Sequence, residues 1–253
     1  MKAMIFAAGL GSRLKPITDT IPKALVSVGG KPLLQHTIEK LKLAGFNEII
    51  INIHHFGEQI IDFVKSNNYF DIRIEFSDER ENLLDTGGGI KKASHFFDDD
   101  KPFLVHNVDI LSNIDLKDLY SYHINNKSVA TLVCSDRNTL RYLCFDKDNL
   151  LRGWINKKTR EIKSPVPNFK PVLYNHLAFS GIHIISPFIF SHMQNMTDRF
   201  SIIDFYLSIC DHEKISCYSA KNSQMIDVGK LESLLLAENF LSDPDFKKMC
   251  LDE

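Results

Sequence analysis

The residues best suited to chemistry lie near the start of the chain, where glycines and cations follow a short apolar run. They are residues 4–7, then Gly9, Gly11, Arg13, Lys15 and Lys23. The apolar run predicts a buried strand, since a strand covered on both faces needs no polar alternation. Glycines let a phosphate approach the main chain. A strand end, exposed N–H groups and fixed cations together indicate a site for a polyanion.

Two common nucleotide-binding motifs are absent from this stretch. The dinucleotide-binding fingerprint requires a third glycine at position 14, where the chain has Leu14. The phosphate loop of nucleotide hydrolases requires Gly-Lys-Ser or Gly-Lys-Thr, and neither follows Gly11. The first absence argues against a nicotinamide- or flavin-dependent oxidoreductase.

A second candidate group is a carboxylate at a strand end. Residues 103–109 predict a strand that finishes at Asp109. A carboxylate in that place can hold a hard cation, because Mg²⁺ binds through one or two carboxylates plus substrate phosphates. The alternative is that Asp109 caps a helix at 115–123, but Ser112, Asn113 and Asp115 lie closer to that helix.

The elements expected to position these residues alternate in type along the first half of the chain. We expect strands at 49–53 and 72–76, and helices at 33–43 and 57–67, with Gly45 ending the first helix. This alternation predicts a mostly parallel sheet with helices on both faces, whose ligands lie beyond the carboxyl ends of the strands. His54 and His55 also follow a strand, and without a third ligand nearby we interpret them as turn residues.

The second half of the chain predicts more elements. Residues 86–91 include three consecutive glycines, which indicate either a flexible loop or a helix start with a ligand or another backbone close by. We further expect a strand at 129–133, a hairpin of 141–145 with 150–155, and a strand at 178–185 in which Gly181 indicates either a bulge or the close approach of a ligand. A long loop is expected at 156–175, followed by a helix at 201–210 that Ser201 caps. The chain should then end with a strand at 225–227, a helix at 230–241 and a frayed end at 242–253.

Composition excludes several classes of function. The 253 residues are 44% apolar and 25% charged, with a formal net charge of −2, so no electrostatic argument supports binding of nucleic acid or of an anionic membrane. We expect no signal peptide and no transmembrane segment. The five cysteines show no CxxC spacing, which favours reduced thiols and a cytoplasmic location. The oligomeric state stays open.

The segment from Gly9 to Lys23 closely resembles the signature of the sugar-1-phosphate nucleotidyltransferases. Two further segments, Thr86–Gly89 and Phe179–Ile182, are most similar to those of N-acetylmuramate-1-phosphate uridylyltransferases, with mannose-1-phosphate guanylyltransferases as the next resemblance. The chain departs from the family pattern in places, with Asp85 for Glu, Val108 for Gly, and Met225 and Lys230 for Trp and Thr. Near 156–158, Asn-Lys-Lys replaces the Glu-Lys-Pro whose Glu contacts the sugar, so that contact is not carried over.

The resemblance implies an α/β fold, with a Rossmann-like, mostly parallel mixed sheet flanked by helices. It implies one nucleotidyltransferase domain over residues 1–253, in which 1–110 mainly binds the nucleotide and 111–241 mainly binds the sugar phosphate. It also implies Mg²⁺-dependent transfer of a nucleotidyl group from a nucleoside triphosphate to a sugar-1-phosphate.

Roles follow from the same resemblance. Arg13 and Lys23 are the expected catalytic residues, and Asp109 and Asp227 the expected Mg²⁺ ligands. The expected nucleotide contacts are Ala8, Gly9, Leu10, Gly11, Ser12, Arg13, Lys23, Asp85, Thr86 and Gly87. The expected sugar-phosphate contacts are Asn107, Ser180, Gly181 and Lys230.

The resemblance is compatible with more than one pair of substrates. UTP with N-acetylmuramate-1-phosphate is the first expectation, ahead of GTP with mannose-1-phosphate and cytidylyl transfer to a phosphorylated alcohol. A non-catalytic regulator that binds a nucleotide sugar is the alternative of a different class. The presence of Arg13, Lys23, Asp109 and Asp227 argues against it, whereas the departures at Val108, Met225 and Lys230 favour it.

Overall fold

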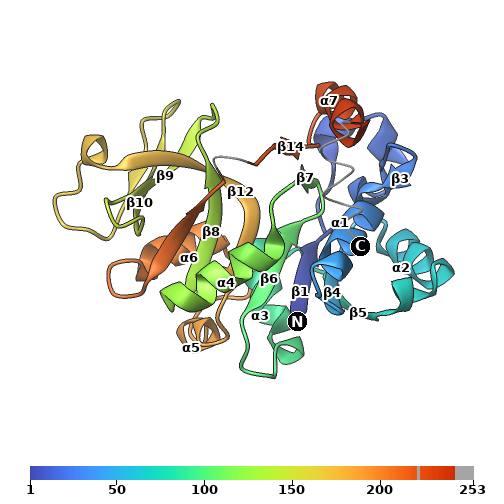
Figure 1. The fold of residues 1–253 in the computed structure, drawn as a ribbon, viewed down its shortest axis with the longest axis horizontal. Coiled ribbons are helices and arrows are strands. Elements are labelled where there is room, and N and C mark those ends of the chain that lie inside the picture. The colour runs from blue at the N-terminus through green and yellow to red at the C-terminus, as the bar shows by residue number, and fades with distance from the viewer. Residues whose placement is uncertain (221–222, 243–253) are drawn as a thin grey trace. The chain divides into compact units, whose positions relative to one another are not determined.

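The computed structural model describes residues 1–220 and 223–242, which form two compact units (Figure 1). The first unit comprises 1–83, 105–117 and the described residues from 223 onward, and the second comprises 84–104 and the described residues of 118–222. The first unit therefore contains both the glycine-rich start of the chain and the segment around Asp227. No helix among the described residues is long and apolar enough to cross a membrane.

The first unit contains the parallel strands. β1 (Lys2–Phe6) lies between β6 (Phe103–Asn107) and β4 (Glu48–Ile53), and β5 (Arg73–Asp78) follows β4. The β1–β4 and β4–β5 pairs are parallel. The continuous apolar runs are explained by burial, since Ile49, Ile50 and Ile51 are fully buried.

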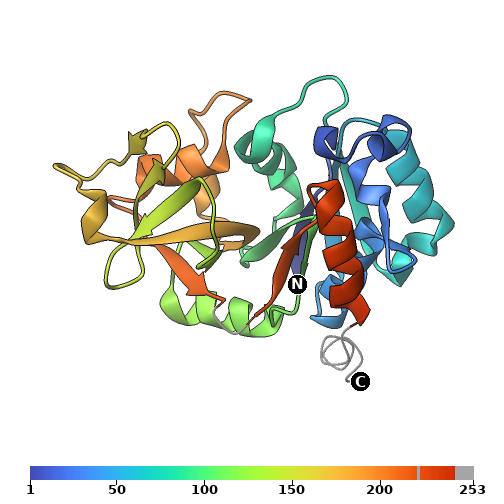
Figure 2. The ribbon, with the colours of Figure 1, turned by 90° about the horizontal axis from the view of Figure 1, so that it is seen from above.

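Helices and short turns complete this unit. Helices α1 (Leu33–Leu43) and α2 (Gly57–Ser66) connect the parallel strands, and Gly45 ends α1 with a φ of 88°, as predicted. Between β1 and α1 lie 3₁₀ turns at 12–14, 17–19 and 23–25 and the hairpin of β2 (Ser27–Val28) with β3 (Lys31–Pro32). Helix α7 (Leu231–Ser242) packs on this hairpin, where Gly29 N donates to Glu238 Oε1 over 2.8 Å (Figure 2).

The second unit contains an antiparallel sheet with one parallel edge. Its strand order is β11 (Ile162–Lys163), β10 (Leu151–Asn156), β9 (Arg141–Phe145), β12 (Asn175–Ile185), β8 (Ala130–Ser135) and β13 (Ile215–Ser219). Only the β8–β13 pair among these is parallel. The hairpin is confirmed, and so is the bulge, since the β12–β8 register shifts around Gly181.

The remaining helices are α3 (Asp85–Lys92), α4 (Leu116–Asn126), α5 (Ile189–His192) and α6 (Ile202–Ile209). A further two-stranded pair joins β7 (Ile110–Ser112) to β14 (Met225–Asp227).

The predicted cap of α6 is confirmed, because the Ser201 side chain accepts from Asp204 N. The loop expected at 156–175 is partly wrong, since it contains β11 and a 3₁₀ turn at 171–173. The predicted α/β class with a mixed sheet is confirmed. Of the frayed end expected at 242–253, Ser242 is instead the last residue of a helix, and the rest lies outside the described residues.

The consecutive glycines of α3 are explained by a neighbouring backbone. A Cβ on Gly88 would lie 2.0 Å from the carbonyl oxygen of Asp198, and one on Gly87 would lie 2.3 Å from the Phe200 ring. Gly87 N also donates to Phe200 O over 2.8 Å. The helix therefore needs glycine here so that the segment 198–200 can pack directly on its backbone.

We expect Gly88→Ala to destabilise the protein, although alanine is favoured over glycine by about 1 kcal/mol in an unhindered helix. A side chain 2.0 Å from a carbonyl oxygen forces the backbone apart, and overpacking of this kind costs about 1–3 kcal/mol. Urea unfolding measures the difference. Gly9→Ala is the control, because a Cβ on Gly9 meets no described atom within 4 Å. A Gly88→Ala variant as stable as the native protein would contradict this account.

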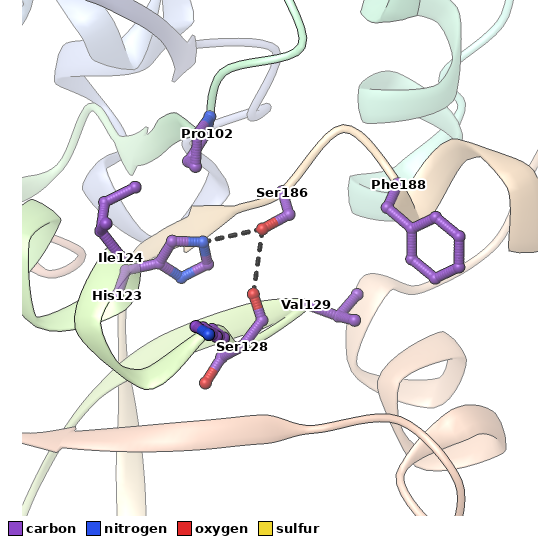
Figure 3. Close-up of a pocket in the computed structure, with 8 residues that line it drawn as sticks. Pro102, His123, Ile124, Ser128, Val129, Ser186 and Phe188 are labelled. Carbon is purple, nitrogen blue, oxygen red and sulfur yellow. Dashed lines mark hydrogen bonds between the residues drawn. The ribbon is translucent and has the colours of Figure 1, made fainter.

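A pocket of about 290 Å³ in the second unit is backed by a buried histidine (Figure 3). Ser186 Oγ donates to Ser128 O over 2.9 Å, so with its single hydrogen committed it accepts from His123 Nε2, also over 2.9 Å. His123 Nδ1 is then left to accept from Thr131 Oγ1. Burial lowers the pKa of His123 to about 4, so the imidazole is neutral and structural.

The neutral state of His123 makes stability depend on pH. Because its folded-state pKa of about 4 lies below the ordinary 6.5, the unfolded chain binds the proton more readily, and stability is lost as pH falls below 6.5. The loss from this group amounts to about 2 kcal/mol at about pH 5. We expect His123→Gln, which keeps a donor for Ser186, to remove that share of the acid sensitivity. Urea unfolding of both proteins at about pH 7.5 and about pH 5 tests this. Equal acid losses in the two proteins would show that His123 is not responsible.

Candidate active site

The glycine-rich loop after β1 is held in place by side chains from outside it. Asn52 Oδ1, at the end of β4, accepts from Ala7 N over 2.8 Å and from Ala8 N over 3.3 Å. Asn52 is itself fixed by a 2.8 Å bond from its Nδ2 to Glu79 Oε1, and both side chains are buried. The start of the loop is therefore rigidly attached to the parallel sheet.

Within the loop, Gly11 needs to be glycine. Its φ is 63°, and a Cβ there would lie 2.8 Å from Thr18 Cγ2. The carbonyl oxygen of Gly11 accepts from Leu14 N and from Thr18 Oγ1, both over 2.8 Å. Gly9 differs, because it has no positive φ and the space beside it is open. Gly9, Leu10, Ser12 and Arg13 are exposed, so the loop presents main chain and a cation to solvent.

Lys23 and Asp109 form an ion pair at the ends of two segments far apart in sequence. Lys23 Nζ contacts Asp109 Oδ2, and the two side chains are only 11% and 18% exposed. Each of these two largely buried charges offsets the desolvation cost of the other, because an isolated buried charge is strongly unfavourable. The Asp109 backbone is fixed as well, since its carbonyl oxygen accepts from Val228 N over 2.8 Å.

Asp227, the last residue of β14, and Arg13 both lie beside Gly229. A Cβ on Gly229 would lie 2.6 Å from Asp227 Oδ1 and 2.8 Å from Arg13 Nη2. Asp227 pairs with Ile110 in the β14–β7 register, so it is adjacent to the residue that follows Asp109. All four residues predicted for catalysis and metal binding therefore belong to the first unit, at the junction of the glycine-rich loop with β7 and β14.

The two aspartates suit the predicted Mg²⁺ in chemical type. Both supply carboxylate oxygens, which are the ligands that Mg²⁺ prefers, and they come from neighbouring paired segments. Lys23 occupies one oxygen of Asp109, and Asp227 is exposed. The donor set thus matches the usual Mg²⁺ arrangement of one or two carboxylates completed by substrate phosphates.

Two predicted sugar-phosphate contacts also lie in the first unit. Asn107 ends β6 and is half-buried, and its carbonyl oxygen accepts from His106 Nδ1 over 2.8 Å. Burial lowers the pKa of His106 to about 4, so this neighbour is neutral. Lys230 is exposed immediately before α7, and its carbonyl oxygen accepts from Ser233 N.

The other predicted contacts lie in the second unit. Asp85 is exposed with a φ of 61°, and its side chain accepts from Thr86 N over 2.6 Å. Thr86 Oγ1 accepts from Ile202 N, and the amide of Gly87 is committed to Phe200 O. At the β12 bulge, Ser180 Oγ is buried, and no hydrogen-bond partner for it exists among the described residues. A buried hydroxyl of this kind can still bind a ligand oxygen.

The residues that support the loop lie outside the predicted site residues. Asn52 and Glu79 carry no motif, although a polar residue inside the apolar run 49–53 was a usable signal for the first. Gly229, whose lack of a side chain admits both Arg13 and Asp227, is also absent from the predicted site residues. Thr18 was not singled out, and only the structure shows its bond to Gly11.

Known proteins resemble this chain in sequence. An N-acetylmuramate alpha-1-phosphate uridylyltransferase of Neisseria meningitidis is 46% identical over 115 residues, which cover 46% of this chain and 49% of the relative. A mannose-1-phosphate guanyltransferase of Yarrowia lipolytica is 36% identical over 137 residues, which cover 53% of this chain and 38% of the relative. The matched part thus spans half or less of these curated relatives.

Solved structures and a family model extend the likeness to nearly the full chain. HddC of Yersinia pseudotuberculosis complexed with GMP-PN has a TM-score of 0.74 at 26% identity, covering 94% of this chain and 98% of that one. A putative glucose-1-phosphate thymidylyltransferase of Bacillus anthracis has a TM-score of 0.79, with 99% of this chain and 98% of that chain covered, and at 20% identity it supports the fold alone. The family model described as "Nucleotidyl transferase" matches residues 2–243. The chain therefore belongs to the nucleotidyl transferase family.

Proposed function

We propose that this protein transfers a nucleotidyl group from a nucleoside triphosphate to a sugar-1-phosphate, releasing pyrophosphate and a nucleotide sugar. The observation that carries the proposal is the grouping in one unit of the Lys23–Asp109 pair with Arg13 and Asp227 around Gly229. Membership of the family over residues 2–243 supports it.

The proposed reaction needs no covalent intermediate on the protein. An oxygen of the sugar-1-phosphate attacks the α-phosphorus, a new P–O bond forms, and the bond from the α-phosphorus to the bridging oxygen of pyrophosphate breaks. Both reactants are anions, so the protein must place them in line and neutralise charge. A loop that begins on the parallel sheet, with Lys23 held by Asp109 and Arg13 exposed on the loop surface, meets that requirement.

Each residue at the loop then has a role. Arg13, exposed on the loop, contacts the leaving β- and γ-phosphates, and Lys23 neutralises charge at the α-phosphate. Asp109 and Asp227 would hold Mg²⁺, which when bound offsets charge on the transferring phosphoryl group. Lys23 and Asp109 also fix each other's position, so the cation is preorganised before the nucleotide binds.

The remaining contacts are proposed on the same basis. Main-chain groups of Gly9 to Ser12 hold the nucleotide phosphates beside Ala8, whose amide is committed to Asn52 Oδ1. Asp85, Thr86 and Gly87 lie at the base. Asn107, Ser180, Gly181 and Lys230 contact the sugar phosphate. The proposed contact of Ser180 with the sugar phosphate is supported by its buried hydroxyl, which has no hydrogen-bond partner among the described residues.

UTP with N-acetylmuramate-1-phosphate is the substrate pair that we propose first, since the relative in Neisseria meningitidis that carries this name is 46% identical in the matched part. GTP with mannose-1-phosphate is the second candidate. It is supported by guanyltransferase relatives at 34–37% identity.

We expect one productive pair when pyrophosphate release is measured with Mg²⁺ and each of ATP, GTP, CTP, UTP and dTTP against a panel of sugar-1-phosphates. UTP with N-acetylmuramate-1-phosphate should give the highest kcat/KM. A different productive pair would correct the substrates and leave the reaction class intact. Tight nucleotide binding without pyrophosphate release across the panel would instead favour a non-catalytic nucleotide-sugar sensor.

We expect Arg13→Ala to lose about 3–4 kcal/mol of transition-state stabilisation, or about 10²–10³-fold in kcat, because a positioned cation on the leaving group is absent. Lys15→Ala is the matched control. Lys15 lies on the same loop, but its side chain is 63% exposed and pairs with Asp19, so its removal should change kcat little. Steady-state kinetics on the productive substrate pair measures both variants. Near-normal turnover of Arg13→Ala would overturn the assigned role.

A further inference from the structure

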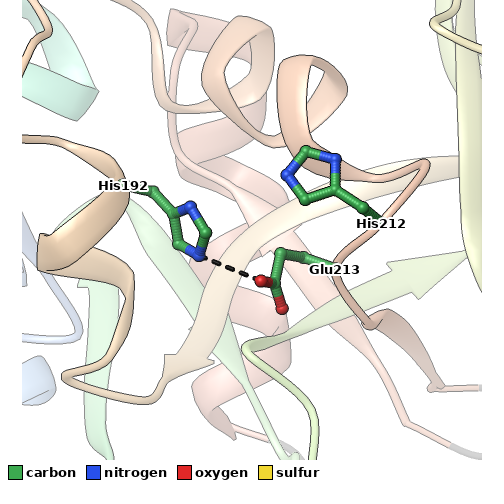
Figure 4. A group of neighbouring side chains, drawn as sticks. All are labelled: His192, His212 and Glu213. Atoms are coloured by element: carbon green, nitrogen blue, oxygen red, sulfur yellow. Dashed lines mark ion pairs between the residues drawn. The ribbon is translucent and has the colours of Figure 1, made fainter.

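Three side chains with metal-binding atoms converge in the second unit, and none of them has a role in the proposed transfer. They are His192, His212 and Glu213, whose ligand atoms all lie within 4.8 Å of one another. Figure 4 shows the three side chains directed toward one space from two separate segments of the chain. Among the described residues, these three are the histidine, cysteine or acidic side chains whose ligand atoms gather closely enough to hold one metal ion.

The fold fixes both segments. His192 is the last residue of α5. After α6, the amides of His212 and Glu213 both donate to Ile209 O, over 3.2 and 2.8 Å, so a backbone turn sets the two side chains. The next residues enter β13, which is paired with β8. The cluster is therefore built on defined elements of the second unit.

The Nε2 atom of His192 is available to bind a ligand, although Glu213 lies beside it. Its Nε2 lies 3.0 Å from Glu213 Oε1, yet this buried nitrogen makes no hydrogen bond among the described residues. The separation is close to the ~3.4 Å between two ligands bound ~2.1 Å from a tetrahedral Zn²⁺. His192 Nε2 and Glu213 Oε1 are thus spaced like two ligands of one metal ion, but they are not aligned as a hydrogen bond requires.

His212 has the outer partner that metal-binding histidines usually have. Its Nδ1 lies 2.6 Å from Asp211 Oδ1. A carboxylate can only accept, so Nδ1 carries the proton and the Nε2 lone pair is available. Figure 4 shows the His212 ring turned toward His192. Carboxylate, histidine and metal in series is a recurrent arrangement at zinc sites.

We propose that His192, His212 and Glu213 form a binding site for a borderline first-row divalent cation of the Zn²⁺ class, with Asp211 positioning His212. Two imidazoles and one carboxylate suit such a cation, with water in the open fourth position. The site differs in chemistry from the carboxylate pair Asp109 and Asp227, whose oxygen donors suit Mg²⁺. A bound cation joins the end of α5 to the turn before β13.

Metal binding is tested on the tag-free, metal-stripped full chain in excess Mg²⁺, with Co²⁺ as a spectroscopic probe and Zn²⁺ as competitor. We expect one site with the visible spectrum of tetrahedral, nitrogen-ligated Co²⁺, displaced by Zn²⁺. His212→Ala and Glu213→Gln should bind at least about tenfold more weakly, and Asp211→Ala about 10–100-fold more weakly. His95→Ala, another exposed histidine of this unit, is the control and should bind like the native protein.

Urea unfolding with and without Zn²⁺ gives an independent readout. Because a ligand of the folded state alone raises its stability, Zn²⁺ should raise the unfolding midpoint of the native protein and of His95→Ala, but not that of His212→Ala. His212 is exposed, so its replacement leaves the fold intact. Unchanged Co²⁺ affinity in both His212→Ala and Glu213→Gln would overturn the proposal and leave His192 and Glu213 as a simple ion pair.

Discussion

The ion pair between Lys23 and Asp109 is the interaction on which the candidate active site depends. Both charges are largely withdrawn from water, and each compensates the desolvation of the other. The pair ties the end of the glycine-rich segment to the turn after β6. Because Asp109 O also accepts from Val228 N, the same residue fixes the approach of the segment that carries Asp227. One residue, through its carboxylate and its backbone carbonyl oxygen, therefore organises three stretches that are remote in sequence.

A second buried polar pair performs the same task for the loop itself. Asn52 and Glu79 lie at the ends of β4 and β5, and through Asn52 Oδ1 they commit the amides of Ala7 and Ala8 to the protein. The amides further along the loop, at residues that are exposed, are the ones left to face a phosphate. Buried polar groups that are satisfied in this way rigidify their surroundings, and electrostatic stabilisation of a transition state requires such rigidity.

Much of this arrangement could be predicted from the sequence, because it depends on local patterns. The apolar runs of β1 and β4, the positive φ of Gly11 and the cap at Ser201 each follow from a few adjacent residues. The contacts between remote segments could not be predicted in the same way. Nothing near Gly88 in sequence indicates that Asp198 O packs on it, and nothing near Lys23 indicates that its partner is Asp109. Such pairings are decided by tertiary packing, which a short window of sequence does not contain.

Histidines illustrate how strongly the surroundings decide the chemistry of one residue type. His123 and His183 are buried with pKa values lowered to about 4 and about 3, and their ring nitrogens bond protein hydroxyl groups. They are held neutral as parts of the core. His192 and His212 lie nearer the surface, beside carboxylates rather than hydroxyls. A carboxylate both fixes the tautomer of an imidazole and attracts a cation, so the same side chain that is inert in the core becomes a metal ligand at this turn.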